Sequence, residues 1–227
     1  MSKKQNQKIC VYCGLKATSK DHVPPKQMFP EPRPDNLETV PACTKCNNSS
    51  GKDEEYFLAT FMFSEVGVSG AGKKLWQERL HRRYKEDLGL RRKIVQNLSP
   101  KDIYTPYGIF IGKRMTIELD MNRIYRTIRK IIKGLYYIEY REIMSDTQDL
   151  DCLFLQTQSH FDTIKDYADK LKNGCKMWTG IFQYKHNRTE EGLPGSMWLL
   201  NFYDFAIFWV IGYENITTSK QHNETDK

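Results

Sequence analysis

The sequence has no long hydrophobic run, and this absence argues against a membrane-spanning segment. Its mean hydropathy is −0.66, and no stretch approaches the roughly 18 consecutive apolar residues that a spanning helix needs. The most apolar stretch, residues 197–213, is interrupted by Asn201 and Asp204. The segment MSKKQNQK is charged and precedes no apolar segment, so no signal peptide is expected. We therefore expect a cytoplasmic protein that does not contact a membrane.

Histidine and cysteine are scarce and unevenly placed. The 227 residues include five histidines and six cysteines. Four of the cysteines form two Cys-x-x-Cys pairs before residue 47, and His22, between those pairs, is the only histidine among the first 80 residues. In a cytosolic chain such pairs are typical of metal binding rather than of disulfide bonding. The side chains that bind metals and transfer protons are thus concentrated in one N-terminal segment.

The charge is also concentrated in the N-terminal part. The net charge of the chain is +7. Residues 1–100 carry 18 Lys and Arg against 11 Asp and Glu, whereas the numbers are equal in the rest of the chain. A local basic excess attracts polyanions and accelerates their encounter with the protein. This distribution is compatible with nucleic-acid binding, although a basic soluble surface would explain it equally well.

Hydrophobic periodicity predicts an α+β fold. An apolar stripe predicts a helix that begins near Thr44, or one that is interrupted at Gly51. Further helices are predicted at 73–88, 123–140 and 161–171, and strands at 91–95, 113–120 and 152–155. Strands at 177–185, 196–203 and 205–213 should form an antiparallel sheet. We expect a small module over residues 1–62, a larger α+β domain of unknown role over 63–215, and a flexible tail at 216–227.

The two cysteine pairs predict a structural zinc site. Two intervening residues allow both thiolates of a pair to reach one tetrahedral ion, and Gly14 permits the tight turn after the first pair. The expected ligands are Cys10, Cys13, Cys43 and Cys46. Four cysteines leave no open position for water or substrate, so any hydrolysis has to use other residues.

Asp21, His22 and Asn47 are the side chains that a hydrolytic metal site requires. The carboxylate of Asp21 and the amide oxygen of Asn47 are hard ligands that suit Mg²⁺. His22 titrates near neutrality and can take a proton from water. Neighbouring side chains on a regular strand point to opposite faces, so Asp21 and His22 would meet one phosphate only at a bend or at the strand edge. Asn48, next to Asn47, is an alternative ligand.

The order of these motifs resembles the HNH endonucleases, which are also called ββα-metal or His-Me finger nucleases. The resemblance covers residues 9–57 and consists of Cys-x-x-Cys, Asp-His-Val-x-Pro, Asn-Leu and Cys-x-x-Cys-Asn. It implies a β-hairpin followed by a helix, with zinc as a structural ion. Many members of the family have His where this sequence has Asn47, whereas others use Asn there as a metal ligand. The expected fold is thus a small zinc-containing ββα-metal (HNH) module followed by a larger α+β region with an antiparallel sheet.

The resemblance also implies a role for individual residues. Asp21 and Asn47 would bind one catalytic Mg²⁺ or Mn²⁺, His22 would be the general base, and Asn36 would orient His22 or its loop. Contacts with nucleic-acid phosphates are expected from basic side chains of the module and from a basic cluster that follows it: Lys26, Lys45, Lys52, Arg82 and Arg83.

The resulting functional hypothesis is a metal-dependent endonuclease that cleaves DNA and leaves 5′-phosphate and 3′-hydroxyl ends. By resemblance, such proteins occur in phage defence and in mobile elements. The alternatives are a non-catalytic, zinc-containing module that binds nucleic acid, an RNA-directed nuclease, and a subunit that is active only with a partner. A protein partner, or a second copy bound through the C-terminal domain, is compatible with each of them.

Overall fold

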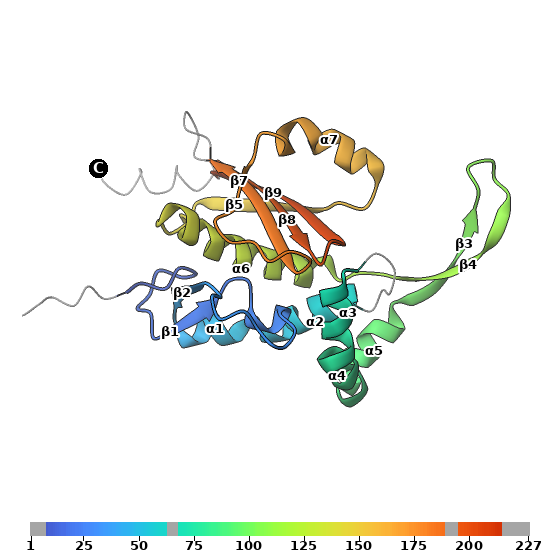
Figure 1. The fold of residues 1–227 in the computed structure, drawn as a ribbon, viewed down its shortest axis with the longest axis horizontal. Coiled ribbons are helices and arrows are strands. Elements are labelled where there is room, and N and C mark those ends of the chain that lie inside the picture. The colour runs from blue at the N-terminus through green and yellow to red at the C-terminus, as the bar shows by residue number, and fades with distance from the viewer. Residues whose placement is uncertain (1–7, 63–67, 189–194, 215–227) are drawn as a thin grey trace, which may run out of the picture.

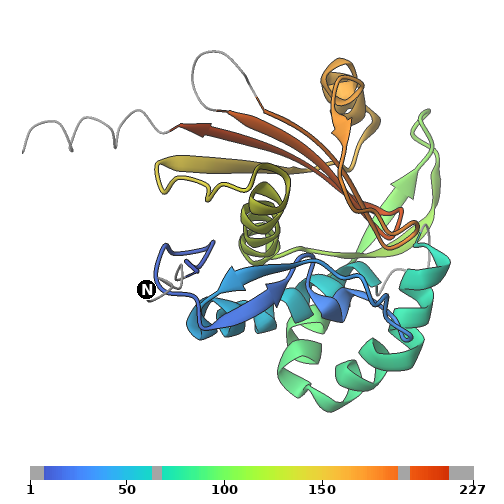
Figure 2. The same ribbon diagram turned by 60° about the vertical axis from the view of Figure 1, so that its left-hand side comes forward.

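The computed structural model describes residues 8–62, 68–188 and 195–214. It is a mixed α/β structure in which all strand pairs are antiparallel. The described strands form two two-stranded sheets, β1–β2 and β3–β4, and a five-stranded sheet of order β5-β9-β8-β7-β6. In Figures 1 and 2, α7 lies on one face of the five-stranded sheet and α6 on the other. The β1–β2 hairpin and α2 lie beyond α6.

The N-terminal part is a hairpin followed by two short helices. β1 (Ser19–His22) pairs with β2 (Thr39–Ala42), and α1 (Thr44–Ser49) and α2 (Gly51–Met62) follow, after a short 3₁₀ turn between the strands at Lys26–Met28. The helical segment is therefore interrupted next to Gly51, which is one of the two alternatives that the sequence leaves open. The predicted flexible tail at 216–227 lies outside the described residues.

The next segment is entirely helical, which differs from the prediction. The single helix expected at 73–88 is divided into α3 (Gly70–Leu75), a π-helical turn (Trp76–Leu80) and α4 (His81–Glu86). The prediction of a strand at 91–95 is wrong, because these residues belong to α5 (Leu88–Gln96). The Asp87 carboxylate accepts the backbone N–H of Leu90 at 2.9 Å and so caps the helix. Leu90 and Ile94 are buried one turn apart, which is the spacing of a helix face.

The C-terminal part contains the remaining strands and the longest helix. Its elements are β3 (Leu98–Tyr104), β4 (Phe110–Ile117), α6 (Met121–Tyr140), β5 (Gln148–Phe154), α7 (Gln158–Ala168), β6 (Lys172–Asn173), β7 (Phe182–Arg188), β8 (Ser196–Phe202) and β9 (Ala206–Glu214). The predicted antiparallel sheet is confirmed. The strand expected at 113–120 lies three residues earlier, and the strand expected at 177–185 begins only at Phe182, because residues before it form a turn closed by the Trp178–Phe182 bridge.

One hydrophobic core runs through the hairpin, α2, α6 and the five-stranded sheet. Buried Val23, Phe57, Ile128 and Trp198 all belong to it. Gly134 lets α6 lie directly against the residue that follows β1, because a Cβ at this position would lie 2.5 Å from Val23 Cγ2. The Tyr203 hydroxyl also donates a hydrogen bond of 2.7 Å to the Met28 carbonyl. The N-terminal hairpin is thus held by α6 and by the sheet.

The helices of the described residues include none long and apolar enough to cross a membrane. This finding agrees with the absence of a long hydrophobic run in the sequence. The 20 residues of α6 carry a basic stripe that includes Arg126, Lys130 and Lys133. Three basic side chains of α6, those of Arg123, Arg126 and Lys130, pair with carboxylates of α2.

Asp53 at the start of α2 joins that helix to α6. Its two carboxylate oxygens each lie 2.7 Å from an arginine Nε, of Arg123 and of Arg126. Burial raises the pKa of Asp53, but the hydrogen bonds from the two arginines outweigh burial and lower that pKa below its usual range. The two ion pairs of Asp53 therefore stabilise the fold at neutral pH, and this stabilisation is lost in acid.

Asp53→Asn should lower the free energy of unfolding by about 1–3 kcal/mol at pH 7. A carboxyl group with a lowered pKa in the folded state contributes stability above its unfolded pKa of about 4, and loses it as the pH falls through the folded value. The difference between wild type and variant should therefore shrink below about pH 4. Denaturant unfolding from pH 7 to pH 3 measures it, and a difference that does not change with pH would contradict this assignment.

Candidate metal centre

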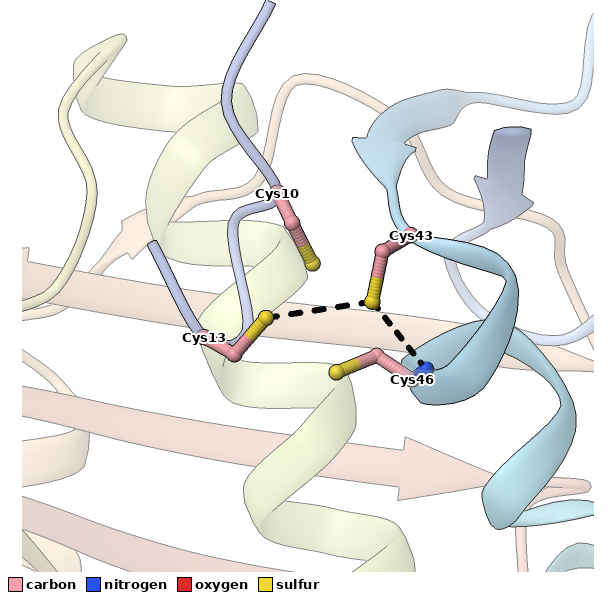
Figure 3. A group of neighbouring side chains, drawn as sticks. All are labelled: Cys10, Cys13, Cys43 and Cys46. Carbon is pink, nitrogen blue, oxygen red and sulfur yellow. Dashed lines mark hydrogen bonds between the residues drawn. The ribbon is translucent and has the colours of Figure 1, made fainter. Parts of the chain in front are cut away.

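Four cysteine thiols converge between the first turn of the chain and the start of α1. The ligand atoms of Cys10, Cys13, Cys43 and Cys46 all lie within 4.8 Å of one another (Figure 3). A tetrahedral Zn²⁺ with Zn–S bonds of about 2.3 Å places sulfur atoms about 3.8 Å apart. The distance between the sulfur atoms of Cys13 and Cys43 is 3.8 Å. The four side chains therefore fit a tetrahedral metal ion such as zinc.

Local backbone geometry positions the two cysteine pairs. The first pair lies in a turn in which Gly14 donates to the Cys10 carbonyl at 3.0 Å, and Gly14 adopts a φ of +69°. Only glycine adopts that left-handed conformation without strain, which accounts for Gly14 directly after the pair. Cys43 is the N-cap of α1 and accepts the backbone N–H of Cys46 at 3.4 Å. That N–H···S bond lowers the pKa of Cys43 to about 7, which favours the thiolate that a metal requires.

Asp21 and His22 lie on opposite faces of β1. Asp21 pairs across the hairpin with Val40 and His22 with Thr39. Cross-strand partners share a face, and Asp21 and Val40 are both buried whereas His22 and Thr39 are half-buried. The alternation expected of a regular strand is therefore present, and β1 has no bend that would turn both side chains to one side.

Asn47 is fixed against the strand that carries Asp21 and His22. Its amide nitrogen donates to the Lys20 carbonyl at 3.0 Å and lies 3.3 Å from the Ser19 hydroxyl. Because Ser19 pairs with buried Ala42, its side chain shares the face of Asp21. Asp21 and Asn47 are thus brought to one face of the hairpin, and these bonds leave the amide oxygen of Asn47 as its remaining acceptor.

Lys130 of α6 lies against Asp21, a contact that the sequence analysis did not predict. Its ammonium is 2.7 Å from Asp21 Oδ2, 3.0 Å from Glu54 Oε1 and 2.6 Å from the Ser50 hydroxyl. The Asp21 oxygen is buried and is ion-paired with Lys130 without a well-aligned hydrogen bond. The Tyr12 ring lies beneath the ammonium at 5.4 Å. Two buried carboxylates thus share one ammonium, so the cluster carries an excess negative charge when both are ionised.

The donor atoms near Asp21 partly fit a second, harder cation. A buried carboxylate oxygen without an aligned hydrogen bond and an amide oxygen are ligands that Mg²⁺ accepts. The Lys130 ammonium competes for the same carboxylate. Within the described ranges, the four cysteines are the only group of three or more His, Cys, Asp and Glu side chains close enough to hold a metal.

The other predicted site residues have varied surroundings. Asn36 is exposed in the loop before β2, and no described hydrogen bond joins it to His22. Lys26, Lys45 and Lys52 are exposed around the hairpin and the two helices. Arg83 is 2.7 Å from Glu55 of α2, and Arg82 is 3.9 Å from Glu86 in the next turn. Arg83 is thus engaged in holding α4 against α2.

Comparisons with protein-family models, with curated proteins and with solved structures find no match to this chain.

Proposed function

We propose that this chain is a metal-dependent endonuclease of the HNH type that hydrolyses phosphodiester bonds in DNA and leaves 5′-phosphate and 3′-hydroxyl ends. The observation that carries the proposal is the hydrogen bond from the Asn47 amide to the Lys20 carbonyl. It attaches the residue after the last cysteine to the strand that carries Asp21 and His22. Strand, strand and helix follow one another here as they do in the ββα-metal motif that the sequence resembles.

His22 is the proposed general base. Burial, and then the positive charge of Lys26, lower the pKa of His22 from its usual value. The imidazole is therefore neutral at pH 7 and can accept a proton from the attacking water. Its half-buried position on the outer face of the hairpin leaves it within reach of a substrate.

Asp21 and Asn47 are the proposed ligands of the catalytic ion. When bound, Mg²⁺ or Mn²⁺ neutralises charge on the phosphoryl and leaving oxygens. Asp21 and Asn47 share one face, whereas His22 lies on the other, so the phosphodiester has to reach both from the edge of β1. In the described part of the chain β1 pairs with β2 alone, so no further strand covers that edge, where the Asn47 amide contacts the Lys20 carbonyl.

A non-catalytic, zinc-containing module that binds nucleic acid is the second candidate. The ion pair between Asp21 and Lys130 favours it, because a carboxylate that is already neutralised needs no metal. Incubation of the protein with supercoiled plasmid and Mg²⁺ or Mn²⁺ separates the two candidates. The nuclease predicts nicked or linear DNA with ligatable ends. If the protein binds DNA or RNA but cleaves neither, the nuclease proposal is contradicted. That result favours the binding module, or a nuclease that requires a partner.

A further inference from the structure

The β3–β4 hairpin is a two-stranded ribbon that stands away from the body of the molecule (Figure 1). Each of its strands pairs only with the other among the described residues. Its turn is well defined, because Thr105 accepts the backbone N–H of Gly108 at 2.9 Å and donates its own to the Ile109 carbonyl at 2.8 Å. The ribbon is therefore a formed element that extends into solvent, and the burial of a core does not explain it.

The tip of the ribbon is apolar and exposed. Tyr107 is 92% exposed, Ile109 64% and Phe110 52%. Tyr104 packs edge-on against Phe110 with their ring centroids 5.7 Å apart. Contiguous apolar side chains that stay in water are unfavourable in a free protein and mark a binding surface.

The stem of the ribbon carries basic side chains without acidic partners. Lys101 and Arg114 lie directly opposite each other on one face, and like charges in that position destabilise a hairpin. Neither makes an ion pair with a described residue, whereas Lys113 on the other face is 3.4 Å from Asp102. A polyanion would neutralise the Lys101–Arg114 pair.

The helix before the ribbon extends this basic surface. Residues 91–93 of α5, Arg-Arg-Lys, are all exposed and have no ion pair within the described chain. They are separated from the start of β3 by only four residues. The basic surface thus begins at the root of the ribbon and continues along its stem.

We propose that the β3–β4 ribbon is an arm that enters a groove of duplex DNA. Lys101, Arg114 and the basic residues of α5 contact phosphates, and the apolar tip lies against the base pairs. The inference rests on the proposed function in one respect, since it states how the substrate of that nuclease is held.

The dimensions and chemistry of the ribbon suit a DNA groove. At about 3.3 Å per residue, the seven residues of β3 span roughly 23 Å. The major groove is about 12 Å wide and admits a two-stranded ribbon. Proteins that bind the minor groove also insert apolar side chains between base steps, which a tip of this composition could do.

Charge favours DNA over a second copy of the chain as the occupant. Each copy carries a net charge of +7, so two copies repel each other. A basic stem would meet a basic partner in such a dimer. DNA supplies the opposite charge along the whole ribbon.

The test is binding of the full-length, zinc-loaded protein to a fluorescent duplex, without added divalent ions, over a series of salt concentrations. The charge variant is Lys101→Gln with Arg114→Gln, and the tip variant is Tyr107→Ser with Ile109→Ser. The control, Lys165→Gln with Lys170→Gln in and after α7, makes the same change in net charge. All replaced side chains are exposed, so the thermal midpoints of unfolding should stay close to that of the wild type.

At about 0.1 M salt the charge variant should bind roughly tenfold to a hundredfold more weakly, and the slope of log K against log salt should fall by about 2. The tip variant should bind several-fold more weakly with an unchanged slope. Wild-type affinity in both variants would overturn the proposal. So would a dimer that the tip variant converts to monomer without a change in DNA binding, because the ribbon would then contact a second copy.

The same proteins separate this proposal from the nuclease proposal. If the wild type binds through the ribbon but does not cleave plasmid with Mg²⁺ or Mn²⁺, the arm is supported and the nuclease is not. If the wild type cleaves and the ribbon variants bind normally, the nuclease is supported and the arm is overturned.

Discussion

Cys43→Ser is expected to abolish zinc binding and to destabilise the whole chain. The thiolate of Cys43 lies 3.8 Å from that of Cys13 and caps α1, so its loss removes a ligand and weakens a helix start together. Metal binding to such a site is coupled to folding. We expect a loss of at least about 3 kcal/mol of unfolding free energy, which lowers the thermal midpoint by roughly 6–12 °C for a domain of this size.

Cys175→Ser is the matched control for this prediction. Cys175 is an exposed cysteine outside the cluster, and its sulfur lies 3.6 Å from the Tyr184 hydroxyl. The measurement is elemental analysis of zinc per chain together with thermal unfolding. The wild type and the control should each contain one zinc, and Cys43→Ser should contain little or none. Equal zinc content in all three proteins would show that the four cysteines do not form the site.

Lys130→Met should destabilise the fold strongly. Its ammonium is the shared partner of Asp21 and Glu54, both of which are buried. Removal of one partner from a buried charge cluster leaves uncompensated charge and typically costs about 3–5 kcal/mol. Chemical denaturation at pH 7 measures the loss. The hairpin should detach from α6 first, because Asp21 belongs to β1 and Lys130 to α6.

Lys133→Met is the control for Lys130→Met. Lys133 lies about one turn further along α6 and makes no ion pair with a described residue. It should change the unfolding free energy by no more than about 0.5 kcal/mol. Millimolar Mg²⁺ should then restore part of the stability of Lys130→Met, because Asp21 and Asn47 would be free to bind it. Equal stability of the two variants would exclude a structural role for the ion pair.

Local sequence predicted the N-terminal elements well because their chemistry is local. Paired cysteines and the glycine after the first pair specify a turn, and the second pair specifies the start of α1. The four thiols then meet in space as their spacing requires. The alternation of side chains on β1 also follows from the extended backbone alone, and it placed Asp21 and His22 on opposite faces.

Contacts between distant segments could not be predicted in the same way. Lys130 belongs to a basic helix face that periodicity alone indicates to be solvated, and only the packing of α6 on the hairpin brings it to Asp21. The error at 91–95 has a different, local cause, because Asp87 caps a helix that continues through these residues. The ribbon was missed because the strand β3 was not predicted. Without a second strand, the sequence predicted no hairpin here, and therefore no exposed tip.

The measurement that tests the proposed nuclease most directly is cleavage of supercoiled plasmid by wild type, His22→Ala and Thr39→Ala in Mg²⁺ or Mn²⁺. Thr39 is the cross-strand partner of His22, so its replacement perturbs the same place in the hairpin without removing the base. We predict that the wild type and Thr39→Ala cleave, and that His22→Ala, folded and zinc-loaded, is slower by about 10²–10⁴-fold. Equal cleavage by all three proteins, or none by the wild type, would contradict the account.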